Sequence, residues 1–373
     1  MRVSRRHALA RLGIGVVAHA AMPSFVMTIR AEVEGGHGPI RLGRNENAHG
    51  PSPKVIATIE RAARLVNRYP EAEAELLRRE IARLHGIQPD RIVLGSGAGE
   101  ILRAAIHGLA GPGGTVAAAA PGYDVFQSMV IGAGCHLRSV RLNEEHSHDL
   151  AAMLAASDST TRLVYICNPN NPTGTLTRRR DIEAFLAKLP SDIFVIIDEA
   201  YHEYVGPTSD YASFLERPVD DRRVIVVRSF SAIYGLAGMR VGYAIADSPT
   251  ASLLTSSGLE ADLTALSARA AVAAMRDPEH VRMSAARNTD DRQEFFNQAN
   301  ARMLRAIDSV TNFVLLDTGG PARDVIGGLA RHDIIVAGPF GAGNRHIRVS
   351  IGTRAEMDEF WRAWDRIPIR MSM

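Results

Sequence analysis

The sequence predicts an α/β protein, with a large domain built on a mostly parallel sheet between helices and a smaller α+β domain. Apolar, β-branched runs of strand length alternate with amphipathic helical stretches after residue 28. Continuous apolar strands between helices are typical of a parallel sheet that helices cover on both faces. A chain of 373 residues is long enough to bury a large core and a second, smaller one.

Strands and helices alternate through the large domain, which we place at residues 67–250. The predicted strands are Arg91–Leu94, Thr115–Ala118, His136–Leu142, Leu163–Cys167, Phe194–Asp198, Val224–Arg228 and Val241–Ala246. The predicted helices are Glu100–Leu109, Tyr123–Gly132, Asp149–Ala156 and Arg178–Leu189.

The smaller domain is predicted at residues 251–373, where the sequence changes character. A long helical region, Ala261–Ala306, is rich in alanine and arginine and leads into short strands. Residues 29–66 precede the first strand of the large sheet and are rich in turn residues, so we expect this arm to join the smaller domain. The short strands are predicted at Asn312–Leu316, Ile334–Val336 and His346–Ser350.

Composition excludes several classes of protein. The net charge is +2 and the basic residues are scattered, which gives no reason to expect nucleic acid. Two cysteines, Cys135 and Cys167, cannot form a disulfide framework, and no metal-ligand spacing is present. No apolar run approaches the roughly 18 residues of a membrane span. Nearly all basic residues are arginines, and the only lysines are Lys54 and Lys188.

The N-terminus has the order of an export signal. Arg5 and Arg6 precede a weakly apolar stretch from Leu12 to Ala18, and a small-residue site ends at Ala20. This order is similar to a twin-arginine signal, which predicts a periplasmic or exported protein. The alternative is a basic or disordered tail over residues 1–28 on a cytoplasmic protein.

Polar motifs follow the predicted strands at their carboxyl ends, where open α/β sheets bind ligands. The first, Gly95-Ser96-Gly97-Ala98-Gly99-Glu100, opens a helix, and its backbone N–H groups suit an anion. The last runs from Ser229 to Gly242 and combines two serines with Arg240, a set that suits a phosphate.

Two further motifs lie between these. The loop Asn168-Pro169-Asn170-Asn171-Pro172-Thr173-Gly174 is rigid and presents amide side chains. The strand Phe194–Asp198 ends in a carboxylate that is costly to bury without a positive partner. A magnesium ATPase is excluded because no glycine-rich loop contains a lysine. The remaining interpretation is a carboxylate paired with the protonated pyridine nitrogen of pyridoxal 5′-phosphate (PLP).

Together the motifs resemble the fold-type I PLP-dependent aminotransferases, most closely the histidinol-phosphate aminotransferase branch. The resemblance covers about residues 40 to 365 and keeps the motifs in order. It adds Asn45-Glu46-Asn47, Arg68-Tyr69-Pro70 and Arg348-Val349-Ser350-Ile351-Gly352-Thr353 to the four loops above.

The resemblance implies a role for each site residue. The backbone N–H groups of Ala98 and Gly99 would bind the cofactor phosphate. Tyr123 would stack on the pyridine ring and Asp198 would pair with its nitrogen. Tyr69 would reach the phosphate of a partner subunit, which implies a homodimer. The remaining roles are phosphate binding by Ser229, Ser231 and Arg240, hydrogen bonds to the phenolic oxygen from Asn171 and Tyr201, and substrate binding by Asn171, Arg348 and Glu46.

The resemblance also locates a departure at Ala232. Family members carry there the lysine that binds the cofactor as a Schiff base and moves the substrate proton. Alanine can do neither, so we expect the chain to be inactive as an aminotransferase. The neighbouring site residues are all present, which favours an engineered replacement. The alternative is a natural non-catalytic binder of PLP or of its amino-acid adduct.

Two questions about the reaction stay open at this level. The motifs do not separate an aminotransferase from a PLP-dependent decarboxylase or oxidase on the same scaffold. Relatives that take phosphorylated substrates have an arginine where this chain has Gly338, so we expect a different free amino acid and a 2-oxo acid as the substrates.

Overall fold

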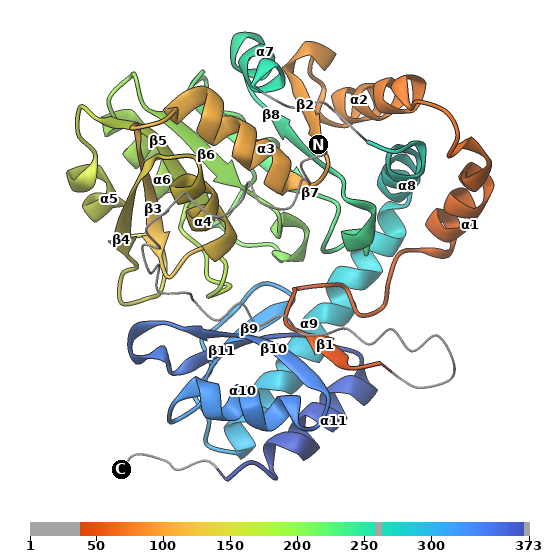
Figure 1. The fold of residues 1–373 in the computed structure, drawn as a ribbon, viewed down its shortest axis with the longest axis vertical. Coiled ribbons are helices and arrows are strands. Elements are labelled where there is room, and N and C mark those ends of the chain that lie inside the picture. Colours follow the sequence, from red (N-terminus) through yellow and green to blue (C-terminus); the bar gives the residue numbers. More distant parts are fainter. Residues whose placement is uncertain (1–37, 258–262, 369–373) are drawn as a thin grey trace, which may run out of the picture. The chain divides into compact units, whose positions relative to one another are not determined.

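The computed structural model describes residues 38–257 and 263–368, and the described residues from Pro39 onward form one compact unit. Two sheets organise this unit, one with the order β2-β8-β7-β6-β5-β3-β4 and one with the order β1-β10-β11-β9 (Figure 1). The strands are β1 (Ile40–Leu42), β2 (Ile92–Gly95), β3 (Thr115–Ala120), β4 (His136–Arg141), β5 (Thr161–Cys167), β6 (Phe194–Asp198), β7 (Val224–Ser229), β8 (Gly242–Ile245), β9 (Phe313–Asp317), β10 (Ile334–Phe340) and β11 (His346–Ser350). The helices are α1 (Pro53–Ala62), α2 (Glu71–His85), α3 (Ala98–Ala105), α4 (Asp124–Gly132), α5 (Leu150–Ala156), α6 (Arg179–Lys188), α7 (Ser248–Ser256), α8 (Ala265–Met275), α9 (Pro278–Ala301), α10 (Ala322–Ala330) and α11 (Arg354–Trp364).

The seven-stranded sheet is parallel except for β8, which confirms the predicted fold class. β8 runs antiparallel to β2 and to β7, so β2 points the same way as the other strands. Side chains alternate between the faces, so that Ile197 of β6 packs in one core and Ile196 in the other. Helices α2, α5, α6 and α8 cover the first face, and α3, α4 and α7 cover the second.

Two helices, α8 and α9, occupy the described part of the predicted helical region Ala261–Ala306. The break falls at Asp277, and Pro278 stands in the first turn of α9. Proline has no N–H and its ring clashes with the preceding turn, so it opens a helix and does not continue one. Residues 53–62 also form a helix, α1, which Ser52 begins by accepting the N–H of Val55.

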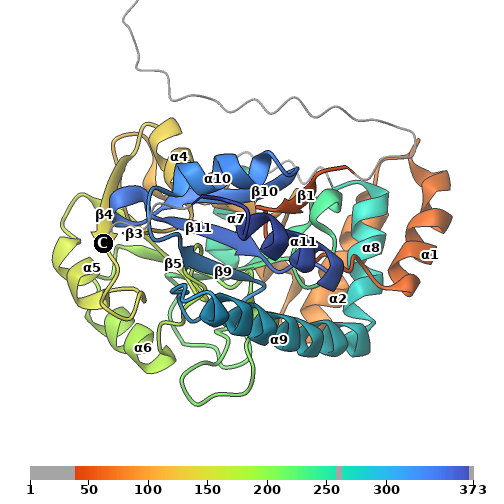
Figure 2. The same cartoon turned by 90° about the horizontal axis from the view of Figure 1, so that it is seen from below.

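The four-stranded sheet has its own core. Ile347 and Val349 point from β11 into a cluster with Phe295 of α9 and Phe360 of α11. Helices α9, α10 and α11 gather on this face of the sheet (Figure 2). Because side chains alternate along β11, Arg348 and Ser350 point to the opposite face.

The N-terminal arm contacts both parts of the unit. β1 pairs in parallel with β10 of the four-stranded sheet, whereas α1 packs against α8, which also packs on α2. The domain boundaries at residues 66 and 250 therefore stay predictions. The predicted export signal at residues 1–28 lies outside the described residues. Among the helices of residues 38–257 and 263–368, none has the length and apolar character of a membrane crossing.

Candidate active site

The predicted site motifs converge at the carboxyl ends of the parallel strands. β2, β5, β6 and β7 point the same way, so the loops that follow them meet at one edge of the sheet. β8 begins at this same edge because it runs in the opposite direction. Arg240, two residues before β8, is therefore brought beside the loop after β2.

An anion cradle forms between Gly97 and Arg240. Gly97 precedes α3 with φ 82° and ψ 160°, a region that glycine alone adopts readily. A Cβ built on Gly97 would lie 2.4 Å from Nη2 of Arg240, so the guanidinium lies directly over the loop backbone. The N–H groups of Ala98 and Gly99 have no hydrogen-bond acceptor within the described part of the chain. A helix N-terminus facing a guanidinium fits a phosphate.

The two predicted serines are on the loop after β7. The Ser229 hydroxyl accepts the backbone N–H of Ser231 at 3.1 Å, which holds the start of this loop. Ser229 is buried and Ser231 is half-buried. Their predicted role in phosphate binding stays a prediction.

Asp198 ends β6 as a buried carboxylate. Tyr165 donates its hydroxyl hydrogen to Oδ2 at 2.7 Å, and the backbone N–H of Ala200 binds Oδ1 at 3.0 Å. Burial raises the pKa of Asp198 to about 6, although both hydrogen bonds act to lower it. No cationic side chain of the described residues pairs with Asp198. A protonated ring nitrogen would supply the missing positive partner.

Tyr123 is half-buried on the turn before α4 and lies close enough to Asp198 to sense its charge. Burial first, and then the charge of Asp198, raises the pKa of Tyr123 to about 12. The side chain is therefore a neutral phenol at physiological pH.

Tyr201 and Asn171 form the opposite wall of the site. The Tyr201 hydroxyl oxygen accepts Nδ2–H of Asn45 at 2.9 Å and Nδ2–H of Asn171 at 3.2 Å. Because two amides donate to this oxygen, the phenolic hydrogen is left to donate to a ligand. Burial raises the pKa of Tyr201, which keeps that hydrogen in place.

Arg348 reaches the site from β11. Its Nη1 donates to Oδ1 of Asn171 at 2.5 Å and its Nη2 donates to the carbonyl of Gly43 at 2.7 Å. Its Nε is buried without a hydrogen-bond partner, and no carboxylate of the described residues pairs with the guanidinium. Burial lowers the pKa of Arg348, but arginine stays charged in proteins. A buried cation with an unused donor fits a substrate carboxylate.

The side chains of two predicted residues make no hydrogen bond to this group within the described part of the chain. Glu46 pairs with Arg41 at 3.5 Å, so its carboxylate has a partner other than a substrate. Tyr69 is 88% exposed at the turn before α2. The predicted roles of both residues stay predictions.

Ala232 lies inside the site wall. It is 4% exposed and packs in a cluster with Tyr201, Tyr204, Ile233 and Phe313. Neither lysine of the chain is near. The Lys54 side chain is exposed and pairs with Asp277 at 2.7 Å. Lys188 is exposed at the end of α6.

Sequence reasoning missed a buried ionic cluster behind the site. Arg228 of β7 binds Glu199 at 2.9 Å and Glu203 at 3.1 Å, and also donates to the Ser213 hydroxyl at 2.8 Å. Tyr234 donates to Glu203 at 3.3 Å. Arg228 directly precedes Ser229 and Glu199 directly follows Asp198 in the chain. Because successive side chains of an extended chain point to opposite faces, this ion pair faces away from Asp198 and Ser229.

Asn45 and Tyr165 were also missed, although signals for them exist in the sequence. Asn45 belongs to the motif Asn45-Glu46-Asn47. Tyr165 carries the one hydroxyl group in the otherwise apolar run Leu163–Cys167. Its alternation places Tyr165 on the same face as Cys167, the register partner of Asp198.

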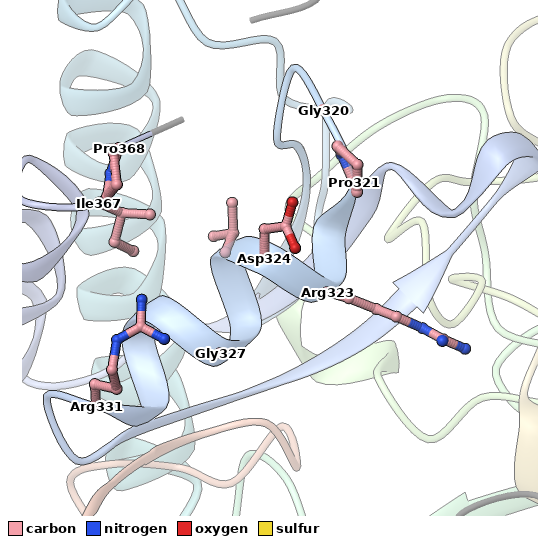
Figure 3. Close-up of a pocket in the computed structure, with 9 residues that line it drawn as sticks. Gly320, Pro321, Arg323, Asp324, Gly327, Arg331, Ile367 and Pro368 are labelled. Atoms are coloured by element: carbon pink, nitrogen blue, oxygen red, sulfur yellow. The ribbon is translucent and has the colours of Figure 1, made fainter. Parts of the chain in front are cut away.

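The hollow in Figure 3 is separate from this site. It has a volume of about 370 Å³ and lies beside α10, lined by Arg323, Asp324, Arg331 and Ile367 among others. None of these residues contributes to the polar group around Asp198 and Arg348.

Comparison with known proteins gives this geometry a family. The family model described as aminotransferase class I and II matches residues 38–363. This chain belongs to that family. The histidinol-phosphate aminotransferase of Akkermansia muciniphila is 38% identical over 322 residues, 86% of this chain and 87% of the relative. Histidinol-phosphate aminotransferase 2 of Carboxydothermus hydrogenoformans is 37% identical over 86% of this chain and 88% of the relative.

A solved structure agrees with both the fold and the family. The histidinol-phosphate aminotransferase of Sinorhizobium meliloti, in complex with pyridoxal-5′-phosphate, superposes on this aminotransferase with a TM-score of 0.83. It is 30% identical, and the match covers 93% of this chain and 98% of that structure.

Proposed function

We propose that this aminotransferase binds PLP at the edge of the seven-stranded sheet and that its residues are arranged for amino transfer from a free amino acid. The observation that carries the proposal is the pair of buried charges without opposite partners, Asp198 and Arg348. Asp198 suits a protonated ring nitrogen, and Arg348 suits a substrate carboxylate. When bound, PLP supplies an electron sink for the bonds of the substrate α-carbon.

Each residue then has a task that follows from its geometry. The N–H groups of Ala98 and Gly99, with Arg240, would bind the phosphate. Asp198 would hold a positive charge on the ring nitrogen. Tyr201 would donate its hydrogen to the phenolic oxygen, because its own oxygen already accepts two N–H groups. The two-pronged guanidinium of Arg348 would bind and orient the α-carboxylate.

We propose that Ala232 occupies the position of the catalytic lysine and that the chain is inactive as it stands. A methyl group has no nitrogen to take a proton from the α-carbon. The surrounding Asp198, Tyr201 and Asn171 keep the hydrogen bonds of a complete site. This supports the replacement of a lysine in an otherwise intact enzyme over a site that has lost its chemistry.

The substrate is proposed to lack a phosphate group. Gly338 of β10 offers no cation, and its φ of 140° with a built Cβ 3.0 Å from the carbonyl of His346 leaves little room for a side chain there. The rings of Phe340 and Phe313 both lie 5.6 Å from the Arg348 guanidinium, which makes this part of the site apolar.

A homodimer is proposed from the surface around Tyr69. Val66 is 68% exposed next to it, and both residues line a groove with Leu263 and Leu266 at the start of α8. Exposed apolar side chains around a groove are typical of a protein interface. Sedimentation of the full chain tests this, and a monomer at micromolar concentration would contradict it.

The test of function uses the Ala232→Lys variant, loaded with PLP and mixed with a panel of amino acids that includes histidinol phosphate. We expect one unphosphorylated donor to give its 2-oxo acid, with a matching change in the cofactor absorbance. Ala232→Met is the control, since its side chain has similar length without an amine. PLP binding without conversion would reject amino transfer, and conversion of histidinol phosphate would reject the substrate proposal.

A further inference from the structure

The carboxylate of Asp198 is held on both oxygens by neutral donors. The Tyr165 hydroxyl occupies Oδ2 at 2.7 Å and the Ala200 N–H occupies Oδ1 at 3.0 Å. Tyr165 comes from the neighbouring strand β5, where its register partner is Ile196, two residues before Asp198 on β6. The hydroxyl therefore reaches along the sheet to the end of the adjacent strand.

The Tyr165 ring is fixed independently of this hydrogen bond. It is 3% exposed and stacks on Phe126 of α4, with ring centroids 3.8 Å apart and an angle of 15° between the planes. Burial, with the charge of Asp198 as the next cause, raises the pKa of Tyr165 well above its usual value. The phenol is neutral, so its hydrogen is available to Asp198 at every physiological pH.

The other ionisable groups around Asp198 do not replace this donor. Burial raises the pKa of Cys167 well above that of a free thiol, and the phenol of Tyr123 is neutral as well. Glu199, the next residue, is paired with Arg228 on the other face of the sheet. Tyr165 is the single side chain of the described residues that donates a hydrogen bond to Asp198.

We infer that Tyr165 is a positioning residue that keeps the Asp198 carboxylate charged and correctly oriented against the cofactor ring nitrogen. A hydrogen bond donated to a carboxylate favours its charged form. When a carboxyl group and a pyridine share one proton, a carboxylate that is stabilised in its charged form leaves the proton on the pyridine nitrogen. The inference rests on the proposed function, because the ring nitrogen belongs to PLP.

The first experiment uses the apoprotein alone. Infrared titration follows the protonated carboxyl band of Asp198, assigned by its loss in Asp198→Asn. We expect a midpoint near pH 6 in the full chain, and a midpoint higher by about one pH unit or more in Tyr165→Phe, as one charge-assisted hydrogen bond predicts. Tyr243→Phe is the control. It removes a tyrosine hydroxyl from β8 of the same sheet, and that hydroxyl bonds His85 at 3.0 Å instead of Asp198. An unchanged midpoint in Tyr165→Phe overturns the inference.

The second experiment adds pyridoxamine 5′-phosphate labelled with nitrogen-15 in the ring. In the full chain and in Tyr243→Phe we expect the signal of a protonated ring nitrogen, whereas in Tyr165→Phe the signal should move toward the neutral pyridine. An identical signal in Tyr165→Phe overturns the inference while leaving the proposed function intact. Failure of the full chain to bind pyridoxamine 5′-phosphate overturns the proposed function, and the cofactor half of this inference falls with it.

Discussion

Replacement of Asp198 by asparagine should stabilise the apoprotein at neutral pH. The carboxyl has an ordinary pKa of 3.8 when exposed and a pKa of about 6 in the folded protein, because burial disfavours its charge. The folded state therefore binds a proton that the unfolded state has released between these pH values. The free energy of unfolding falls as the pH rises from about 4 to about 6, and the lost stability is not regained above pH 6.

The size of this effect follows from the two pKa values. They differ by about two pH units, and each unit corresponds to about 1.4 kcal/mol, so the burial of the charge costs about 3 kcal/mol at pH 7.5. Asparagine is neutral at every pH and avoids this cost. We expect the stability gained by Asp198→Asn to be largest above pH 6 and to shrink by about 3 kcal/mol as the pH falls below 4.

Urea unfolding of the two apoproteins from pH 4 to pH 8 measures the difference directly. Asp192→Asn, at an exposed position, controls for the loss of a carboxylate. Adding pyridoxamine 5′-phosphate should reverse the order at pH 7.5, because only the carboxylate pairs with a protonated ring nitrogen. A stability difference that does not change with pH would refute the account of Asp198 as a desolvated charge.

Two further substitutions test the framework around the site. Arg228→Leu leaves Glu199 and Glu203 buried without their cation and should reduce the free energy of unfolding by about 3–5 kcal/mol, as measured in urea against the exposed Arg222→Leu. Gly97→Ala should weaken the binding of pyridoxamine 5′-phosphate about tenfold or more, measured by titration, because its backbone becomes strained and its Cβ displaces the Arg240 guanidinium. Gly132→Ala, whose Cβ would meet no atom within 4 Å, should bind like the parent. Equal affinity of the two variants would contradict the proposed phosphate cradle.

Local patterns predicted the strands of both sheets well because most of them are short apolar runs between turn residues. Phe194–Asp198 matches β6 at both ends, and His346–Ser350 matches β11. The direction of β8 and its place between β2 and β7 depend on packing between distant segments, which periodicity does not encode. Pro278 marks the start of α9 within the predicted helical region, as expected for a residue that has no backbone N–H.

The site residues divide in the same way. Some belong to sequence motifs, and others are recognised only from their contacts in the folded protein. The structure brings Asp198, Asn171, Tyr201 and Arg348 into one polar group, as the order of the motifs suggested. Tyr165 and Arg228 lie inside strands that look apolar along the chain, and their roles emerge only from the strand next to them. The identity of a residue is read from the sequence, whereas its hydrogen-bond partner is set by sheet register.

The hydrogen bonds of Arg348 and Asn45 distinguish the site for the substrate carboxylate from the site for the cofactor phosphate. The two sites draw on different parts of the fold. The phosphate cradle uses loops beside β2, β7 and β8, all within the seven-stranded sheet. The carboxylate site needs Asn171 from that sheet, Arg348 from β11 and Gly43 beyond β1, and Asn45 bonds Ser350 across 305 residues of sequence. The carboxylate site therefore exists only while the two sheets are held together, whereas the phosphate cradle belongs to one of them. A substitution that loosens the contact between the two sheets should therefore weaken the binding of an amino acid more than the binding of a phosphate.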